Sequence, residues 1–172
     1  MELVTADPRV RVRTLDITDL DDYWQLLERN RDHLGQHGDY AELRAADYEM
    51  IRAGFEQPIP GEYAFGIRVD GGLVGEIVLH PVNPPHYSLG YWIDGEATGN
   101  SHVTTAGRAL LDWARTNTGI TEVYAGVTVG NRPSIAVLDR LGFVKVSDMD
   151  TYTRYRLRLR EASSACASGR TP

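Results

Sequence analysis

A β-hairpin signal in the middle of the chain constrains the fold most. Two runs of strand-forming residues, Tyr63–Val69 and Leu73–Leu79, are separated by Asp70-Gly71-Gly72. An Asp-Gly pair favours the tight turn that joins two antiparallel strands. The sequence therefore predicts an antiparallel pair at the centre of the chain.

The last third of the chain predicts a strand, a helix and two more strands. Glu122–Val129 is almost continuously apolar and β-branched, which is typical of a strand buried on both faces. Asn131–Leu141 follows as a short helix that ends at Gly142, the residue type favoured just beyond a helix end. Phe143–Val146 and Thr151–Leu159 are the last two predicted strands.

The remaining elements follow from apolar periodicity and turn residues. We expect strands at 9–15 and 88–93, an amphipathic helix starting at Leu20, a second helix at 41–55, a helix at 102–116 and a turn at Pro81–Pro85. The sum is an α+β fold: a mixed, mostly antiparallel sheet of six to seven strands flanked by about four helices. We expect one domain over residues 1–160 and a disordered, low-complexity tail over residues 161–172.

Composition supports an ordinary globular domain. The 172 residues are 42% apolar and 24% charged, which fits one domain. The single cysteine, Cys166, excludes an internal disulfide framework and a cysteine-rich zinc site, and the five histidines lack metal-site spacing. No membrane span or signal-peptide core is apparent, so we expect a cytoplasmic protein that acts without a membrane.

The charge pattern argues against a general nucleic-acid binder. The formal net charge is −6 and the pI is about 5.3. All but one of the 18 basic residues are arginine, the exception being Lys145. Arginines alternate with apolar residues along 9–13 and 154–160, which predicts two half-buried strands with arginine-lined outer faces.

Two segments carry a specific resemblance. The first is Leu89–Asp94, followed by a small-polar loop and then Arg108–Ala114; the second is Val129–Phe143, which contains Asn-x-x-Ser-x-x-Val-Leu-x-x-Leu-Gly-Phe. Together they resemble the GNAT acyltransferase superfamily, and within it the group that acetylates ribosomal-protein N-termini (RimJ/RimL-like) and related small amines. The resemblance covers about residues 11–159. It implies the GNAT fold, in which the strands ending at Ile93 and near Val129 splay apart.

The resemblance also implies an activity and a site. The expected reaction moves an acyl group, acetyl above all, from a coenzyme A thioester to a primary amine by direct attack. A backbone N–H near Tyr91–Trp92 would polarise the thioester carbonyl, and Ser134 would protonate the departing thiolate. The residues expected to bind coenzyme A are Trp92, Ile93, Gly99, Asn100, Ser101, His102, Val103, Asn131 and Ser134. Simpler roles stay open: Asn131 as a helix N-cap, Ser134 as an ordinary first-turn serine, and Tyr91 and Trp92 as core or groove lining.

The expected pyrophosphate loop departs from the family pattern, which reads Q/R-x-x-G-x-G/A. Thr98 stands in place of the leading Gln or Arg, Val103 in place of a Gly or Ala, and Ser101 in place of a common glycine. A side chain at a glycine position with positive φ costs roughly 1 kcal/mol, and the branched valine would narrow the approach of an anion. Residues 95–107 contain no Lys or Arg, so backbone N–H groups and more distant arginines would hold the phosphates.

This departure keeps two other hypotheses open. One is a GNAT-fold transferase that takes its acyl group from aminoacyl-tRNA and uses the two arginine faces for phosphate contacts. The other is a non-catalytic module that kept the fold and lost the cofactor loop. The first predicts binding that falls steeply with salt; the second predicts no response to acyl-CoA or charged tRNA.

The acceptor side is less defined by the sequence. Glu76 lies in mid-strand between apolar residues and is the candidate general base. His80 and His86 flank the proline-rich turn and are weaker candidates. His33, His37 and Tyr40, with Asp39, lie in the helix–helix connection that usually shapes the acceptor pocket, so we expect them to bind substrate. We expect the acceptor to be a small-molecule or peptide amine, and both a monomer and a homodimer are compatible with the sequence.

Overall fold

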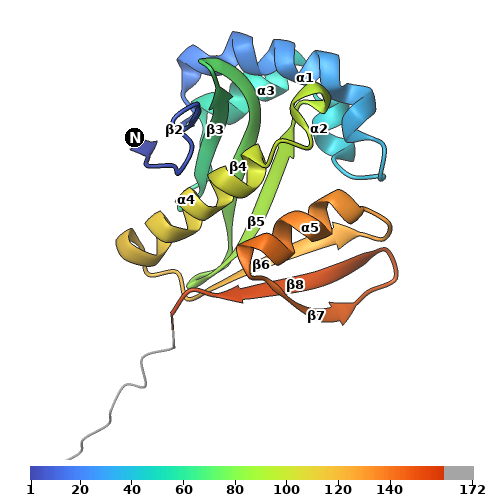
Figure 1. Cartoon of the computed structure of the whole chain (residues 1–172). Coiled ribbons are helices and arrows are strands. Elements are labelled where there is room, and N and C mark those ends of the chain that lie inside the picture. The colour runs from blue at the N-terminus through green and yellow to red at the C-terminus, as the bar shows by residue number, and fades with distance from the viewer. Residues whose placement is uncertain (161–172) are drawn as a thin grey trace, which may run out of the picture.

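The computed structural model describes residues 1–160, and an eight-stranded sheet runs through it in the order β1-β2-β3-β4-β5-β6-β8-β7 (Figure 1). The strands are β1 (Glu2–Leu3), β2 (Val10–Thr14), β3 (Tyr63–Val69), β4 (Gly72–Asn83), β5 (His86–Ile93), β6 (Glu122–Thr128), β7 (Val144–Asp148) and β8 (Tyr152–Arg158). All neighbouring pairs are antiparallel except β5 with β6. The α+β mixed sheet is confirmed, with one strand more than the upper estimate, because the short β1 pairs with β2. The predicted tail at 161–172 and Cys166 lie outside the described residues.

The predicted central hairpin is confirmed. Val69 pairs with Gly72, and both Asp70 and Gly71 have positive φ, as a tight hairpin turn requires. The bounds of the predicted turn at Pro81–Pro85 are wrong, because its first residues belong to a strand. Strand β4 continues through Pro81 to Asn83 and pairs with β5. The proline is tolerated in the strand because the register of the pairing shifts between Pro81 and Asn83.

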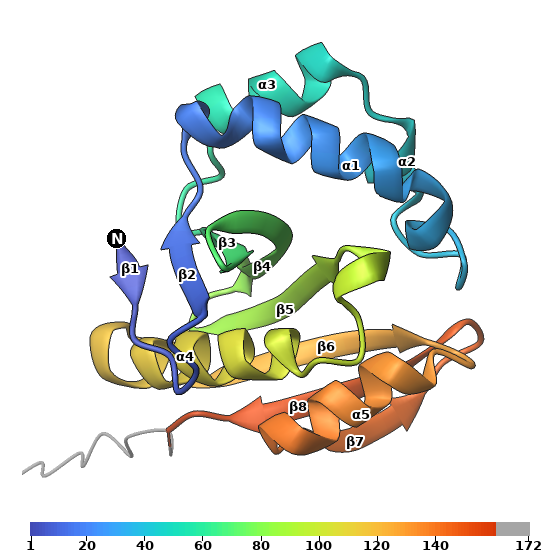
Figure 2. The same ribbon diagram turned by 45° about the horizontal axis from the view of Figure 1, so that its top comes forward.

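Helices cover both faces of the sheet (Figure 2). On one face lie α1 (Leu20–Leu34), α2 (Ala41–Ala45) and α3 (Tyr48–Glu56); on the other lie α4 (His102–Asn117) and α5 (Arg132–Leu141). Two short 3-10 helices, η1 (Ile17–Asp19) and η2 (Gly95–Ala97), precede α1 and α4. The predicted helix at 41–55 is two helices. Ala46 is extended, and the Asp47 carboxylate then caps a new helix by accepting a hydrogen bond from the N–H of Met50 at 2.8 Å.

Each helical layer buries its own core. The main core joins the sheet to α4 and α5 and contains Ile77, Leu110 and Leu138. A second core joins the sheet to α1 and α3 and contains Leu26 and Trp92. Because successive side chains of a strand point to opposite faces, β4 and β5 contribute to both cores.

The prediction that β6 is buried on both faces is wrong. Val123, Ala125 and Val127 are buried, whereas the residues between them are exposed or partly exposed. The second core reaches only as far as Trp92 on β5, so no helix of that layer covers the outer face of β6. There the Arg154 guanidinium lies 4.3 Å from the centre of the Tyr124 ring.

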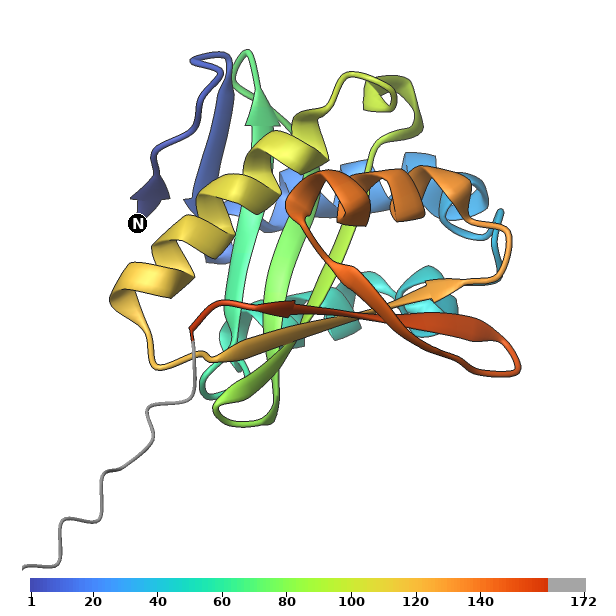
Figure 3. The ribbon, with the colours of Figure 1, turned by 60° about the horizontal axis from the view of Figure 1, so that its bottom comes forward.

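The predicted splaying of the two central strands is confirmed. Strands β5 and β6 pair from His86–Glu122 to Ser88–Tyr124 and then separate (Figure 3). Beyond Ser88, the edge of β5 that faces β6 has no strand partner among residues 1–160. An unpaired edge in the middle of a sheet exposes backbone N–H and C=O groups that a ligand can bind.

Candidate active site

A pocket of about 770 Å³ fills the space between the splayed halves of β5 and β6. Its walls also come from α4, α5, the segment before α4 and the connection between α1 and α2. It brings together most of the predicted site residues: His33, His37, Tyr40, Tyr91, Trp92, Ile93, Gly99, Ser101, His102, Val103, Asn131 and Ser134. Two predicted residues, Asn100 and Glu76, are not among the lining residues.

The free edge of β5 presents the backbone of Tyr91 to the pocket. The Tyr91 carbonyl accepts a hydrogen bond from the Tyr40 hydroxyl, whereas the N–H of Asp94 points to the opposite side and donates to the Val74 carbonyl at 2.7 Å. The N–H and C=O of one strand residue point to the same side, and the side alternates along the strand. The Tyr91 N–H therefore faces the pocket, and the Trp92 N–H faces β4.

The N-terminus of α4 opens onto the pocket without a side-chain cap. Ser101 has a φ of +62°, and its side chain makes no capping hydrogen bond. The first turn of a helix leaves its N–H groups without helical partners. In the same turn, His102 Nδ1 and Thr104 Oγ1 are buried and have no hydrogen-bond partner in the described part of the chain. Free donors and the helix dipole make this end of α4 suitable for an anionic group such as a pyrophosphate.

Two expectations about this loop have different outcomes. The positive φ predicted for a side chain at Ser101 is confirmed. The expected narrowing by Val103 stays a prediction: the valine is only 6% exposed and packs into the main core, but it also lines the pocket. Asn100 is exposed, and its amide donates to the Thr98 carbonyl.

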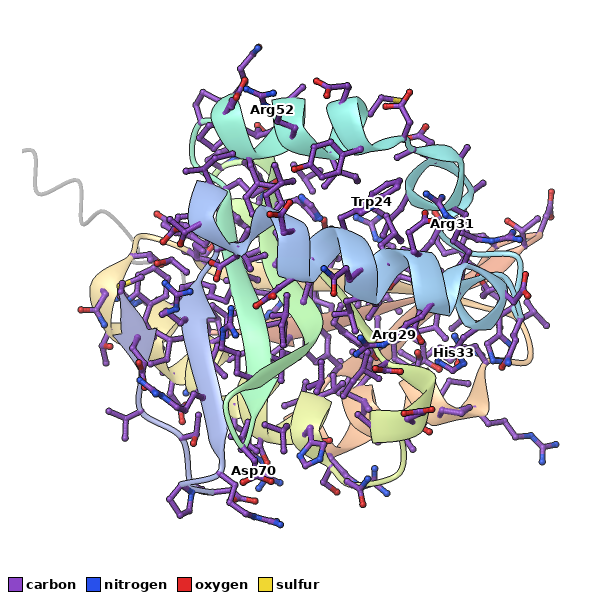
Figure 4. All side chains as sticks on the ribbon, turned by 90° about the horizontal axis from the view of Figure 1, so that it is seen from above. Trp24, Arg29, Arg31, His33, Arg52 and Asp70 are labelled. Atoms are coloured by element: carbon purple, nitrogen blue, oxygen red, sulfur yellow. The ribbon has the colours of Figure 1, made fainter. Side chains whose placement is uncertain are left out.

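Helix α1 holds the segment before α4 in place. The Arg29 guanidinium binds the Asp94 carboxylate at 2.6 Å, and the Gly95 N–H donates to Asn30 Oδ1 at 2.9 Å. Figure 4 shows Arg29 and His33 on the side of α1 that faces this segment. Burial raises the pKa of Asp94, but the Arg29 hydrogen bonds and nearby backbone donors outweigh it, and the pKa ends below its usual value. Sequence reasoning missed these residues; the only local signal is an Asp before a Gly at a strand end.

Helix α5 places Asn131 and Ser134 on the pocket. Asn131 is the N-cap: its Oδ1 accepts a hydrogen bond from the Ser134 N–H at 3.2 Å. The Asn131 amide nitrogen has no hydrogen-bond partner within residues 1–160, so capping leaves a donor for a ligand. The Tyr91 hydroxyl donates to the Ser134 carbonyl at 3.3 Å, and burial raises the pKa of Tyr91 to about 12.

Glu76 lies on the other face of the sheet, beneath α1. Its Oε2 accepts hydrogen bonds from the Tyr23 hydroxyl at 2.8 Å and from Trp92 Nε1 at 3.1 Å. Burial raises the pKa of Glu76, although these two donors oppose the shift. His80 binds Glu62 at 2.6 Å, and His86 lies 3.7 Å from Glu122; neither histidine lines the pocket.

The connection between α1 and α2 spans the open end of the pocket. Tyr40 binds the carbonyl of Tyr91 on β5, and the preceding residue, Asp39, accepts a hydrogen bond from the Thr128 hydroxyl at the end of β6. Consecutive residues thus contact both splayed strands. Tyr40 has a φ of +60°, a conformation that side chains rarely adopt.

A sheet whose one parallel pair opens around a pocket, with a bare helix N-terminus beside it, defines the GNAT class of acyltransferases. The model for the acetyltransferase (GNAT) domain matches residues 9–144, so the chain belongs to this family. It is an acyltransferase.

Several relatives share this fold. "Putative ribosomal N-acetyltransferase YdaF" of Bacillus subtilis (strain 168) is 28% identical over 148 residues, 81% of this chain and 80% of that protein. The solved structure of RimL, a ribosomal L7/L12 alpha-N-protein acetyltransferase in complex with coenzyme A, superposes with a TM-score of 0.83 at 18% identity, covering 92% of this chain and 98% of that one. An acetyltransferase from Salmonella typhimurium that modifies the N-terminal serine of L7/L12 gives 0.78 at 18% identity, with 91% and 99% covered.

Two kinds of feature, a membrane-spanning helix and a metal-binding cluster, are absent from the described part of the chain. Within residues 1–160, no helix has the length and apolarity needed to span a membrane. Over the same range, no three His, Cys, Asp or Glu side chains gather in a way that would hold a metal ion.

Proposed function

We propose that the protein transfers an acetyl group from acetyl-CoA to the α-amino group of a peptide or protein. The observation that carries this proposal is the pocket between β5 and β6, bounded by the uncapped N-terminus of α4. An anionic cofactor fits that end, because buried polar atoms of His102 and Thr104 lack partners there. The Asn131 amide would bind the amide groups of the cofactor arm, and Arg140, the one Lys or Arg side chain among the lining residues, would face a phosphate.

The coenzyme A thioester supplies an activated acetyl group when it is bound. In our proposal the Tyr91 N–H donates to the carbonyl oxygen on which negative charge develops, which is the role of an oxyanion hole. Ser134 lines the pocket, and in our proposal its hydroxyl donates a proton to the leaving sulfur. The acceptor nitrogen attacks directly, and no residue of the chain forms a covalent intermediate.

Glu76 has a different place in this proposal from the one its sequence position predicted. It lies outside the lining residues and binds Trp92, whose backbone continues the edge of β5. We propose that Glu76 positions Trp92 and thereby the strand. Water then accepts the proton that the acceptor amine releases.

The peptide acceptor rests on the relatives. YdaF carries the name of a ribosomal N-acetyltransferase, and the Salmonella typhimurium protein modifies an N-terminal serine. The connection between α1 and α2, with His33, His37 and Tyr40 on the pocket, would bind the first residues of such a chain.

An aminoacyl-tRNA donor has less support. The arginine faces are confirmed as strand faces, but most of their charges are paired within the chain. Arg11 binds Glu2 at 2.7 Å, Arg13 binds Asp19, and Arg156 and Arg158 both approach Glu122. Charges already paired contribute little to phosphate binding.

The experiment is an acetyl-transfer assay with purified protein, acetyl-CoA and two short peptides, one beginning with serine and one with alanine. We expect release of free coenzyme A thiol that depends on peptide, and a peptide mass increase of one acetyl group. Their N-acetylated forms serve as controls that lack a reactive amine. No transfer to either peptide would contradict the proposed acceptor.

A further inference from the structure

The pocket carries opposite charges at its two ends. Among its lining residues, Arg140 is the one Lys or Arg and Asp39 is the one Asp or Glu. Arg140 lies at the end of α5 that meets α4, since Arg108 of α4 donates to its carbonyl at 3.4 Å. Asp39 lies where β5 and β6 are separated, and it accepts a hydrogen bond from Thr128, the last residue of β6. The two charges therefore lie on different elements, one beside α4 and the other at the tips of the splayed strands.

The Asp39 carboxylate has no cation of its own. It is partly buried and accepts a hydrogen bond from Thr128 through Oδ1. Within residues 1–160 it forms no ion pair with Lys, Arg or His. Two other aspartates that face inward, Asp19 and Asp94, are each paired with arginine. A partly buried charge without a partner is costly unless a ligand supplies the opposite charge.

The connection between α1 and α2 places this carboxylate in the same pocket as the free edge of β5. Asp39 and Tyr40 are consecutive, so their Cα atoms are about 3.8 Å apart. Tyr40 binds the carbonyl of Tyr91, the residue whose N–H faces the pocket. A cation bound at Asp39 therefore lies in the pocket on the β6 side, across from the edge of β5 where the acyl carbonyl is expected.

We propose that Asp39 is the specificity-determining residue for the acceptor: it binds the incoming amine as an ammonium ion and selects cationic acceptors over neutral ones. The proposal rests on the proposed acyl transfer in this pocket. The ammonium donates to the free carboxylate oxygen, and it must lose one proton to water before its nitrogen attacks. Arg140 and the N-terminus of α4 attract the anionic donor at the other end, so the pocket orients both substrates by charge.

Two variants separate the charge of Asp39 from its structural bond. Asp39→Asn removes the charge but keeps an oxygen that accepts the Thr128 hydrogen bond. Thr128→Val removes the hydrogen bond but keeps the charge. A third variant, Asp39→Glu, keeps the charge on a longer side chain. Thermal melting establishes that each variant is folded.

The measurement is calorimetric titration of the protein loaded with coenzyme A. The probes are a short peptide beginning with serine and an analogue in which hydrogen replaces the α-amino group. We expect the wild type to bind the amine peptide roughly 10-fold tighter than its neutral analogue, as for a charge-assisted contact. Asp39→Asn should abolish this preference, and Thr128→Val and Asp39→Glu should keep most of it.

Three results would overturn the inference: a wild type with no preference for the amine, Asp39→Asn with the preference intact, or Thr128→Val losing as much as Asp39→Asn. The last would mean that Asp39 only holds the connection between α1 and α2 in place. Because binding is measured without turnover, an intact preference without acetyl transfer would contradict the proposed function and leave this inference standing. Acetyl transfer by a wild type that shows no preference for the amine peptide would contradict this inference and leave the proposed function standing.

Discussion

The indole Nε1 of Trp92 donates a hydrogen bond to Glu76 Oε2 at 3.1 Å, which joins adjacent strands on the face beneath α1. The same oxygen accepts from the Tyr23 hydroxyl of α1. One carboxylate thus ties a helix and the two strands that lead to the pocket. Because burial raises the pKa of Glu76, the contribution of these hydrogen bonds to stability depends on pH.

The first prediction concerns stability and pH. Burial raises the pKa of Glu76 above the ordinary value of 4.5, so the folded protein keeps this proton at pH values where the unfolded chain has lost it. Its contribution to stability is therefore favourable below pH 4.5 and is lost as pH rises through the folded pKa. Glu76→Gln does not titrate. We expect the free energy of unfolding of Glu76→Gln, relative to wild type, to increase as pH rises above 4.5 in urea titrations; a difference that does not change with pH would contradict this.

The second prediction concerns the segment before α4. Asn30→Ala removes the acceptor of the Gly95 N–H and leaves a gap in a buried site. We expect a loss of about 1 to 3 kcal/mol in the free energy of unfolding and weaker coenzyme A binding, because the segment is no longer fixed. Asn117→Ala is a matched control, since this exposed asparagine of α4 bonds only locally. Equal losses in both variants would contradict the role given to Asn30.

The third prediction concerns Val103. Its side chain packs into the main core, so Val103→Ala leaves a cavity instead of widening the approach to α4. We expect a loss of roughly 1 to 2 kcal/mol in stability with no gain in coenzyme A affinity. Tighter binding by this variant, measured by calorimetry, would show that the valine does obstruct the cofactor.

The fourth prediction concerns the proposed acid. Ser134→Ala should lower kcat by roughly 100-fold, which is typical of losing a general acid, and leave the Kd for coenzyme A nearly unchanged. Ser147→Ala, on the exposed β7 strand, is the control. Unchanged turnover in Ser134→Ala would mean that water protonates the leaving sulfur.

Local patterns predicted the fold better than the site. The Asp-Gly turn, the Asn131 cap and the Gly142 helix end each depend on neighbouring residues, and all three are present in the structure. The failures depend on distant contacts. The outer face of β6 is uncovered because the second helical layer stops at β5, and no feature of 122–129 reports where that layer ends.

The candidate site shows the same difference between features set by neighbouring residues and features set by distant contacts. The sequence motifs predicted that the first turn of α5 and the start of α4 would line the pocket, because the residues of each motif lie close together in the sequence. The bond between Asp39 and Thr128 joins residues 89 positions apart, and Arg29 reaches Asp94 over 65 positions. Such pairs depend on how whole elements pack, which periodicity does not encode.

Whether the pocket between β5 and β6 binds acetyl-CoA is tested by a titration of the purified protein with acetyl-CoA, compared with aminoacylated tRNA under the same conditions. We predict saturable binding of one acetyl-CoA per chain, displaced by free coenzyme A and only mildly weakened by salt, with no comparable affinity for the tRNA. Absence of acetyl-CoA binding, or tight salt-sensitive binding of the tRNA alone, would contradict this prediction.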